Sequence, residues 1–379
     1  MRNVAAAGLG IGDDYPPRIM GVLNVSRESP YDPSVYDDPG EAAAYVDEEL
    51  VGEGADIVDV GLESANKRFE VLSAEAELER LDTAVETIES VSGDAVFSIE
   101  TRYAEVADEA LSRGFDMVND ICGFADPAMP DVCEDYDAAV AKMASPPDLE
   151  RPGAVERVDD IYEALKRNGL TDKTIVDPAF GGWSEEKTLE DDRETLHRLR
   201  EFRGLNRPIL VSIDRKNFLR EIAGRPTEEA LPVSLAATSM AVERGAHVVR
   251  THDVAETRDA ALIGDAFARE RARGGDGITV EELDVTDTTE ARRHVERIGG
   301  DPDAAADCAT RVFELGDLTA DVRRELAAAA DERGASFVPV NDAAILAGSP
   351  EQVGAVAAAV AEVAPEFRSV EERIRNPPN

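Results

Sequence analysis

The sequence contains few cysteines, and they follow no pattern that would make them a structural framework. Only three occur in 379 residues, at Cys122, Cys133 and Cys308. None belongs to a Cys-x-x-Cys pair, and none stands in a segment rich in histidine. Disulfide-stapled folds and structural zinc sites depend on such spacings. We therefore expect neither a disulfide framework nor a structural zinc site.

Long apolar runs are also absent. No stretch approaches the ~20 apolar residues that a membrane-spanning helix requires. Residues 1–17 lack the basic region and apolar core of a signal peptide. These absences predict a soluble, cytoplasmic protein.

Positive charge is scarce. The chain has 80 acidic residues against 40 Lys and Arg, a formal net charge of −40, and only six of the basic residues are Lys. Such a surface repels phosphate backbones and anionic lipids, so we expect no nucleic-acid or membrane partner. An apolar content of 43% with regular periodicity argues against a disordered acidic chain. In composition the chain resembles haloarchaeal cytosolic proteins, whose surfaces are adapted to high salt.

This composition predicts that salt stabilises the fold. Repulsion between the acidic side chains is strongest when few ions screen it, so the thermal unfolding midpoint should rise with salt concentration. The measurement is a melting series from ~0.1 M to several molar KCl, a range over which screening becomes nearly complete. A midpoint that does not change with salt would contradict the interpretation.

Strand-like and helix-like patterns alternate through most of the chain. The expected strands are short apolar runs, at residues 18–25, 55–60, 95–99, 115–119, 138–143, 174–176, 208–213 and 246–250. Eight strand–helix units in about 250 residues is the number in a (β/α)8 TIM barrel. A doubly wound open sheet would need a Gly-rich phosphate-binding turn after its first strand, and residues 24–28 contain no glycine. We therefore predict an α/β fold with a (β/α)8 barrel.

A second domain is expected after the barrel. Residues 271–276 have the composition of a linker, which places the barrel at 1–273 and a small C-terminal αβ domain at 274–379. In this domain the pattern predicts one strand, at 336–340, and helices at 289–298, 302–315, 320–333 and 350–362. We find no catalytic constellation there, so its role stays open.

Polar side chains follow several of the predicted strands. Arg250 and His252 end the eighth strand and point the same way on an extended chain, so together they could bind an oxyanion; a capped strand end is the simpler alternative. Further polar residues end the other strands, namely Asn24, Glu100, Asn119, Lys142, Asp177 and Lys216. In a barrel the carboxyl ends of the strands converge on one mouth, where catalysis takes place.

Taken in order, these segments resemble the pterin-binding barrels, and dihydropteroate synthase in particular. The similar segments are residues 19–25, 54–64, 118–121, 177–178, 215–216 and 250–254. The resemblance covers about residues 17–270. Two loops depart from the family pattern, at residues 26–32 and 65–68; in the family these loops close over the aryl amine and the pyrophosphate.

The resemblance implies roles for the strand-end residues in binding a pterin. Asn119, Asp177 and Lys216 would bind the pterin ring, with Asp177 at its guanidine-like edge. Glu100 stands where the family usually has an Asp on that ring.

The same resemblance implies a pyrophosphate site. Asn24, Arg250 and His252 would hold the pyrophosphate, with Mg²⁺ near Asn24, and the catalytic residues would be Lys216, Arg250 and His252. The reaction would join 6-hydroxymethyl-dihydropterin pyrophosphate to p-aminobenzoate and release pyrophosphate, in folate biosynthesis. The family also implies a homodimer.

Three alternatives stay open at this point. The same chemistry could use another aryl amine, as in the methanopterin route. The barrel could bind a pterin without turnover, because the altered loops are those that close over the substrates. A pterin-dependent methyltransferase is the third alternative, although it needs no pyrophosphate site.

Overall fold

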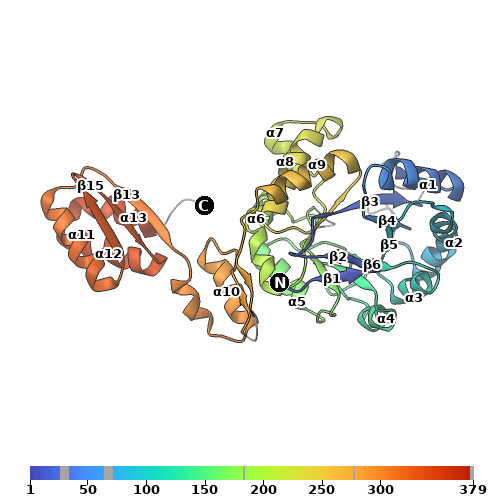
Figure 1. The fold of residues 1–379 in the computed structure, drawn as a ribbon, viewed down its shortest axis with the longest axis horizontal. Helices are drawn as coiled ribbons and strands as arrows, with labels where there is room; N and C mark the ends of the chain where they lie inside the picture. Colours follow the sequence, from blue (N-terminus) through green and yellow to red (C-terminus); the bar gives the residue numbers. More distant parts are fainter. Residues whose placement is uncertain (26–33, 64–70, 182–183, 276–277, 376–379) are drawn as a thin grey trace. The chain divides into compact units, whose positions relative to one another are not determined.

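The computed structural model describes residues 1–25, 34–63, 71–181, 184–275 and 278–375. Two compact units are present, Met1–Glu270 and Arg271–Asn379 (Figure 1). The division lies three residues before the predicted domain boundary. Among the described residues, no helix is both long and apolar enough to cross a membrane.

The first unit is a parallel barrel. Its strands are β3 (Arg18–Asn24), β4 (Ile57–Gly61), β5 (Val96–Thr101), β6 (Met117–Asp120), β7 (Ala139–Met143), β8 (Thr174–Asp177), β9 (Leu210–Val211) and β10 (Val248–Thr251). They form one sheet in the order β8-β7-β6-β5-β4-β3-β10-β9. A parallel bridge between Val176 and Ile209 brings the two edge strands together. The predicted (β/α)8 fold is confirmed.

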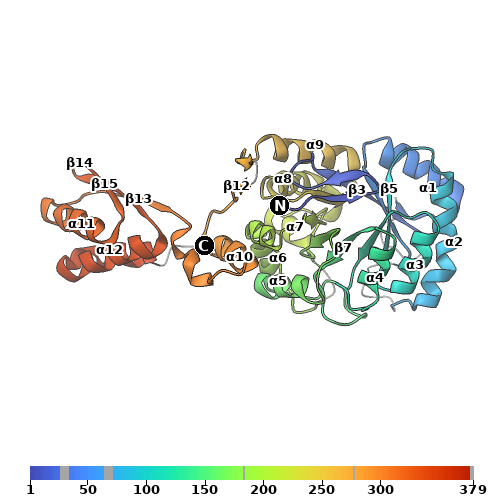
Figure 2. The same cartoon turned by 60° about the horizontal axis from the view of Figure 1, so that its bottom comes forward.

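Helices connect the strands and surround the sheet in two views (Figures 1 and 2). They are α1 (Pro39–Tyr45, continued by a π-helical turn at Val46–Val51), α2 (Ala74–Ser90), α3 (Ala104–Ser112), α4 (Met129–Asp135), α5 (Val158–Lys166), α6 (Leu189–His197), α7 (Asn217–Ala223), α8 (Leu231–Glu243) and α9 (Val254–Ala266). Each buries an apolar stripe against the outer face of the strands, which explains why those strands are apolar on both faces.

Two helical predictions in this unit were wrong in detail. The sequence pattern predicts a helix at residues 227–244 as the connection between β9 and β10, but a further helix, α7, precedes it. α7 ends at Ala223, and Gly224, with a left-handed φ of +63°, closes it. The pattern also predicts that the last helix of the barrel spans residues 253–273, whereas α9 ends at Ala266. Residues 268–273 contain only alanine and charged side chains and offer no apolar stripe to bury.

An N-terminal hairpin closes one end of the barrel. Strands β1 (Val4–Ala6) and β2 (Leu9–Ile11) pair in antiparallel fashion. Their apolar side chains form a core cluster with inward-facing residues of the barrel strands, among them Met20, Met117 and Leu210. No pattern in the sequence predicted this hairpin. Because it packs against the lower layer of the barrel, the carboxyl ends of the strands are the end available for chemistry.

The second unit contains a three-stranded antiparallel sheet in the order β13-β15-β14. Its elements are β13 (Arg311–Leu315), β14 (Ser336–Val340), β15 (Ala343–Gly348), α10 (Thr288–Arg297), α11 (Ala320–Arg333), α12 (Pro350–Val363) and α13 (Arg368–Arg375), after a short ladder of β11 (Arg273–Gly274) with β12 (Val280–Glu281). The helix predicted over 302–315 was wrong. A short 3-10 helix at Pro302–Asp307 precedes β13, where Phe313 and Leu315 face the core in strand alternation.

Candidate active site

A cavity of about 670 Å³ opens at the carboxyl ends of the barrel strands. Five of the predicted site residues line it, namely Glu100, Asn119, Asp177, Lys216 and Arg250. They come from β5, β6, β8, β10 and the start of α7, which the barrel brings together from distant parts of the chain. The other two predicted residues, Asn24 and His252, are not among the residues that line this cavity.

Arg250 is the centre of a charged network in the cavity. Its Nε donates to Asp59 Oδ2 at 2.7 Å, and its Nη2 donates to Glu100 Oε2 at 2.6 Å. Asn119 Nδ2 donates to the same Asp59 oxygen at 2.9 Å. Asp59 lies in residues 54–64, one of the segments that resemble the family, but the resemblance implied no role for it. Its position in the strand could have indicated a role, because Asp59 lies two residues before the end of β4. The alternation of side chains along a strand directs it into the barrel there.

Burial and neighbouring charges act in opposite directions on this network. Burial raises the pKa of Glu100, and the Arg250 guanidinium opposes that rise while the Asp59 carboxylate adds to it. Burial alone would lower the pKa of Arg250, but the carboxylates of Glu100 and Asp59 outweigh it, so the pKa of Arg250 is raised. Arg250 is therefore a permanent cation in contact with two carboxyl groups.

Asp177 ends β8 and is almost completely buried. Its Oδ1 accepts a hydrogen bond from the backbone N–H of Ala179 at 2.7 Å. Burial raises the pKa of Asp177 to about 6, against the opposing effects of the Ala179 N–H and the Lys216 ammonium. This carboxyl group is a hydrogen-bond acceptor above that pH and gains a proton below it.

The turn that holds Asp177 is fixed by a buried ion pair. Ala179 adopts a left-handed conformation with φ 62°. Its carbonyl accepts from Lys187 Nζ at 2.6 Å, and Lys187 lies 3.3 Å from Asp192, which in turn accepts from the Gly181 N–H at 3.0 Å. The ion pair thus orders the backbone that orients the Asp177 carboxyl group.

Lys216 enters the cavity at the start of α7. Burial lowers the pKa of Lys216, and the neighbouring Arg250 lowers it further, whereas Asp177 counteracts both. Its position is set by Arg215, which has φ 48° and donates two hydrogen bonds of 2.9 Å to Asp253. The Lys216 amino group is therefore a hydrogen-bond donor beside a carboxyl acceptor and a guanidinium.

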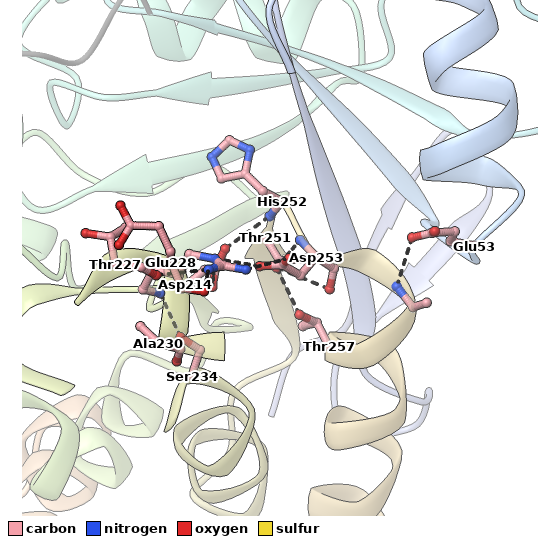
Figure 3. A network of polar contacts seen from close by, with 12 residues as sticks. Glu53, Asp214, Thr227, Glu228, Ala230, Ser234, Thr251, His252, Asp253 and Thr257 are labelled. Carbon is pink, nitrogen blue, oxygen red and sulfur yellow. Dashed lines mark hydrogen bonds and ion pairs between the residues drawn. The ribbon is translucent and has the colours of Figure 1, made fainter. Parts of the chain in front are cut away.

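A polar network joins the ends of β9 and β10 beside the cavity (Figure 3). Asp214 accepts from the backbone N–H of His252 at 3.4 Å, and Ser234 Oγ accepts from the Arg215 N–H at 2.7 Å. The His252 ring points away from the Asp214 and Asp253 carboxylates in Figure 3. Burial, followed by the Arg250 charge, lowers the pKa of His252 to about 3. At neutral pH His252 is a neutral imidazole, so the positive charge at this strand end belongs to Arg250.

Asn24 ends β3 and is held by Ser34, whose Oγ accepts from Asn24 Nδ2 at 3.0 Å. Its amide oxygen faces Gly61, where a Cβ would lie only 3.1 Å away. Among the described residues, no group of three or more His, Cys, Asp or Glu could hold a metal ion. One amide oxygen nevertheless fits Mg²⁺, which is usually carried by phosphate oxygens and water with few protein ligands.

Two predicted features of the site lie outside the cavity or outside the described residues. Lys142 stands near the end of β7 but lies outside the cavity, because it faces the helices and donates to the carbonyls of Arg167 (2.5 Å) and Gly169 (2.7 Å). The altered loops at 26–32 and 65–68 fall outside the described residues.

Comparison with known proteins identifies the family. Residues 20–252 match the model of the pterin binding enzymes. A probable bifunctional folylpolyglutamate synthase/dihydropteroate synthase of Halobacterium salinarum is 34% identical over 260 residues, which are 65% of this chain and 31% of that protein. The dihydropteroate synthase of Bacillus subtilis is 31% identical over 255 residues, which are 66% of this chain and 88% of that enzyme.

Solved structures agree with these matches. Dihydropteroate synthase from Coxiella burnetii in complex with pteroic acid has a TM-score of 0.59 and 29% identity, over 70% of this chain and 98% of that one. The Thermus thermophilus enzyme in complex with 6HMPPP has a TM-score of 0.57 and 29% identity, over 70% of this chain and 100% of that one. The matched region includes all the residues that line the cavity. The chain therefore belongs to the family of pterin-binding enzymes, and its relatives are dihydropteroate synthases.

Proposed function

We propose that the barrel is a dihydropteroate synthase, which joins 6-hydroxymethyl-dihydropterin pyrophosphate to p-aminobenzoate and releases pyrophosphate. The observation that carries this proposal is the cavity in which Asn119, Asp177, Lys216 and Arg250 converge. The relatives with this fold are named for the reaction, and solved ones hold pteroic acid, 4-aminobenzoate or 6HMPPP.

Pterin recognition follows from the hydrogen-bonding groups in the cavity. A pterin presents N–H donors along its guanidine-like edge and a ring carbonyl as an acceptor. Asp177 and the amide oxygen of Asn119 are acceptors for the donors, and the Lys216 ammonium can donate to the carbonyl. Glu100 adds a further carboxyl group, but its Oε2 already accepts a hydrogen bond from Arg250. Its main partner is therefore this guanidinium and not the pterin.

The reaction is a substitution at the methylene carbon of the pterin. The lone pair of the aryl amine forms the C–N bond, the C–O bond breaks, and its electron pair leaves with the pyrophosphate while the nitrogen loses a proton. Arg250 and Lys216 supply positive charge close to the leaving group, where stabilisation of developing negative charge lowers the barrier. The neutral His252 can add a hydrogen bond but no charge.

Mg²⁺ fits this scheme as a partner of the pyrophosphate. Asn24 would supply one oxygen ligand, and the phosphate oxygens and water would supply the rest. When bound, the ion would neutralise part of the pyrophosphate charge.

The decisive experiment is a turnover assay in molar KCl with the purified chain, the pterin pyrophosphate, Mg²⁺ and p-aminobenzoate. The expected result is dihydropteroate and pyrophosphate in equal amounts. Pterin binding without either product would indicate a non-catalytic barrel. Pyrophosphate release only with a ribosylated aniline would assign the methanopterin-type amine instead. A methyltransferase would discriminate little between pyrophosphorylated and plain pterin.

We also propose that the barrel forms a homodimer through α8 and α9. Met240 on α8 and Ile263 on α9 are exposed at 46% and 56%, and Phe267, directly after α9, is exposed at 79%. The two helices contact closely, since Ser239 donates to the Ala260 carbonyl at 2.7 Å. Exposed apolar side chains on paired helices are typical of a subunit interface.

The interface predicts that Ile263→Glu converts the dimer to a monomer, because a charge would be buried without a partner. Light scattering after size exclusion, in molar KCl, measures the mass of the wild type and the variant. Asp265→Asn, on another side of the same helix, is the control and should keep the wild-type mass. A wild type of monomer mass would refute the dimer.

A further inference from the structure

One buried carboxylate, that of Asp59, contacts residues that line the cavity without lining the cavity itself. Asp59 lies on β4 with its side chain fully buried, and it is not among the residues that line the cavity. One of its oxygens, Oδ2, accepts from both Arg250 Nε and Asn119 Nδ2. Arg250 and Asn119 do line the cavity. Asp59 therefore acts on a ligand only through these two residues.

The contact with Asp59 decides which way the Asn119 amide is turned. A carboxylate only accepts hydrogen bonds, so the amide group that faces it must be the NH2. The carbonyl oxygen of Asn119 is then left as an acceptor for a ligand N–H. With a neutral amide at position 59 both orientations of Asn119 could form a hydrogen bond, and this selection would be lost.

The same carboxylate fixes the plane of the Arg250 guanidinium. Arg250 is held at two of its nitrogens, Nε by Asp59 at 2.7 Å and Nη2 by Glu100 at 2.6 Å. Because the guanidinium is a rigid planar fork, two contacts determine the direction of its remaining N–H groups. Glu100 alone would leave the side chain able to pivot about a single contact.

We infer that Asp59 is the positioning residue of this site, which holds Arg250 and Asn119 in the orientations that a pterin ligand meets. The inference rests on the proposed function for the identity of the ligand, but the positioning itself is a property of the free protein. Ser98 provides a matched control. It is the register partner of Asp59 on β5, it is fully buried, and its Oγ forms no hydrogen bond within the described part of the chain.

The test compares Asp59→Asn with Ser98→Ala in the full-length chain. In the first arm, nitrogen NMR of the free protein with labelled Arg and Asn follows the exchange of the Arg250 Nε–H and the Asn119 NH2 with water. Both should exchange slowly in the wild type and in Ser98→Ala, and at least tenfold faster in Asp59→Asn. In the second arm, calorimetry with 6-hydroxymethylpterin should show an affinity loss of about 10- to 100-fold for Asp59→Asn only.

A second variant keeps the inference testable if Asp59→Asn does not fold. Asn119→Asp leaves Asp59 in place but replaces its donor with another acceptor. Two carboxylates in contact share a proton, so above about pH 6 the pterin affinity of this variant should rise as the pH falls. The wild type should show only the loss of affinity that accompanies protonation of Asp177 near pH 6. A role of Asp59 in stability alone predicts no such change in the pH profile.

The outcomes separate the inference from the proposed function. Unchanged exchange at Arg250 and Asn119 in Asp59→Asn, together with affinity within about twofold of the wild type, would overturn the role of Asp59. A wild type that binds no pterin would refute the proposed function, and the exchange measurements would still decide whether Asp59 orders the two side chains.

Discussion

Asp177→Asn is expected to weaken pterin binding by about 2–3 kcal/mol, the effect of replacing a charged acceptor in a buried hydrogen bond with a group that carries its own donors. Asp177 is almost completely buried in the cavity, and its orientation is set by the Ala179 N–H. Calorimetry with a pterin analogue measures the loss. The control is Asp116→Asn, which alters a partly buried Asp that precedes β6, at the opposite end of the barrel.

The protonation of Asp177 adds a pH signature to this prediction. Burial raises the pKa of Asp177 to about 6, so the wild type should lose affinity as the pH falls through that value and the acceptor takes up a proton. Asp177→Asn should lack this step, while Asp116→Asn should keep it. Wild-type affinity in Asp177→Asn would show that the ring binds elsewhere.

Arg250→Ala is expected to have two effects. Removal of the guanidinium leaves the buried carboxylate of Asp59 and the partly buried one of Glu100 without their cation, which should cost about 3–5 kcal/mol of folding free energy. Denaturant unfolding in molar KCl measures this loss. The pyrophosphorylated pterin should also bind about 10- to 100-fold more weakly, whereas plain 6-hydroxymethylpterin should lose less, since a charge-assisted contact to phosphate disappears.

Variants of neighbouring groups sharpen the comparison. Arg250→Lys should recover only part of both losses, because an ammonium cannot contact two carboxylates in one plane. His252→Gln should change pyrophosphate binding little, since the pKa of His252 is lowered to about 3 and the imidazole carries no charge to lose. Equal losses for the two pterins in Arg250→Ala would remove the evidence for a pyrophosphate contact.

Periodicity predicted the barrel well because it depends on local patterns. Each parallel strand is a short apolar run followed by an amphipathic helix, and eight repetitions leave few alternatives. The same approach was wrong for residues 302–315. Alanine-rich segments have high helix propensity, which favoured a helix here. The alternation that indicates a strand rests on only two apolar residues, Phe313 and Leu315, and the strand is recognised from its pairing with β15.

Strand-end position alone did not identify the site residues. Lys142 and Asp177 both stand at strand ends, yet Lys142 faces the helices and Asp177 faces the cavity. The difference is one residue of register, since successive side chains on a strand point to opposite faces. The family resemblance identified five residues that line the cavity. It assigned no role to Asp59, which does not line the cavity and contacts residues that do, such as Arg250.

The sequence by itself determined the fold class, the family and five of the polar residues that line the cavity, because each depends on local order along the chain. Only the tertiary structure decided which of these side chains meet. Arg250 on β10 contacts Asp59 on β4 and Glu100 on β5, and β3 lies between β10 and β4 in the sheet. Such contacts cross the barrel interior and exist only once the sheet curves round on itself. Burial there, rather than residue type, raises the pKa of Asp177 to about 6 and lowers the pKa of His252 to about 3, so that His252 is neutral.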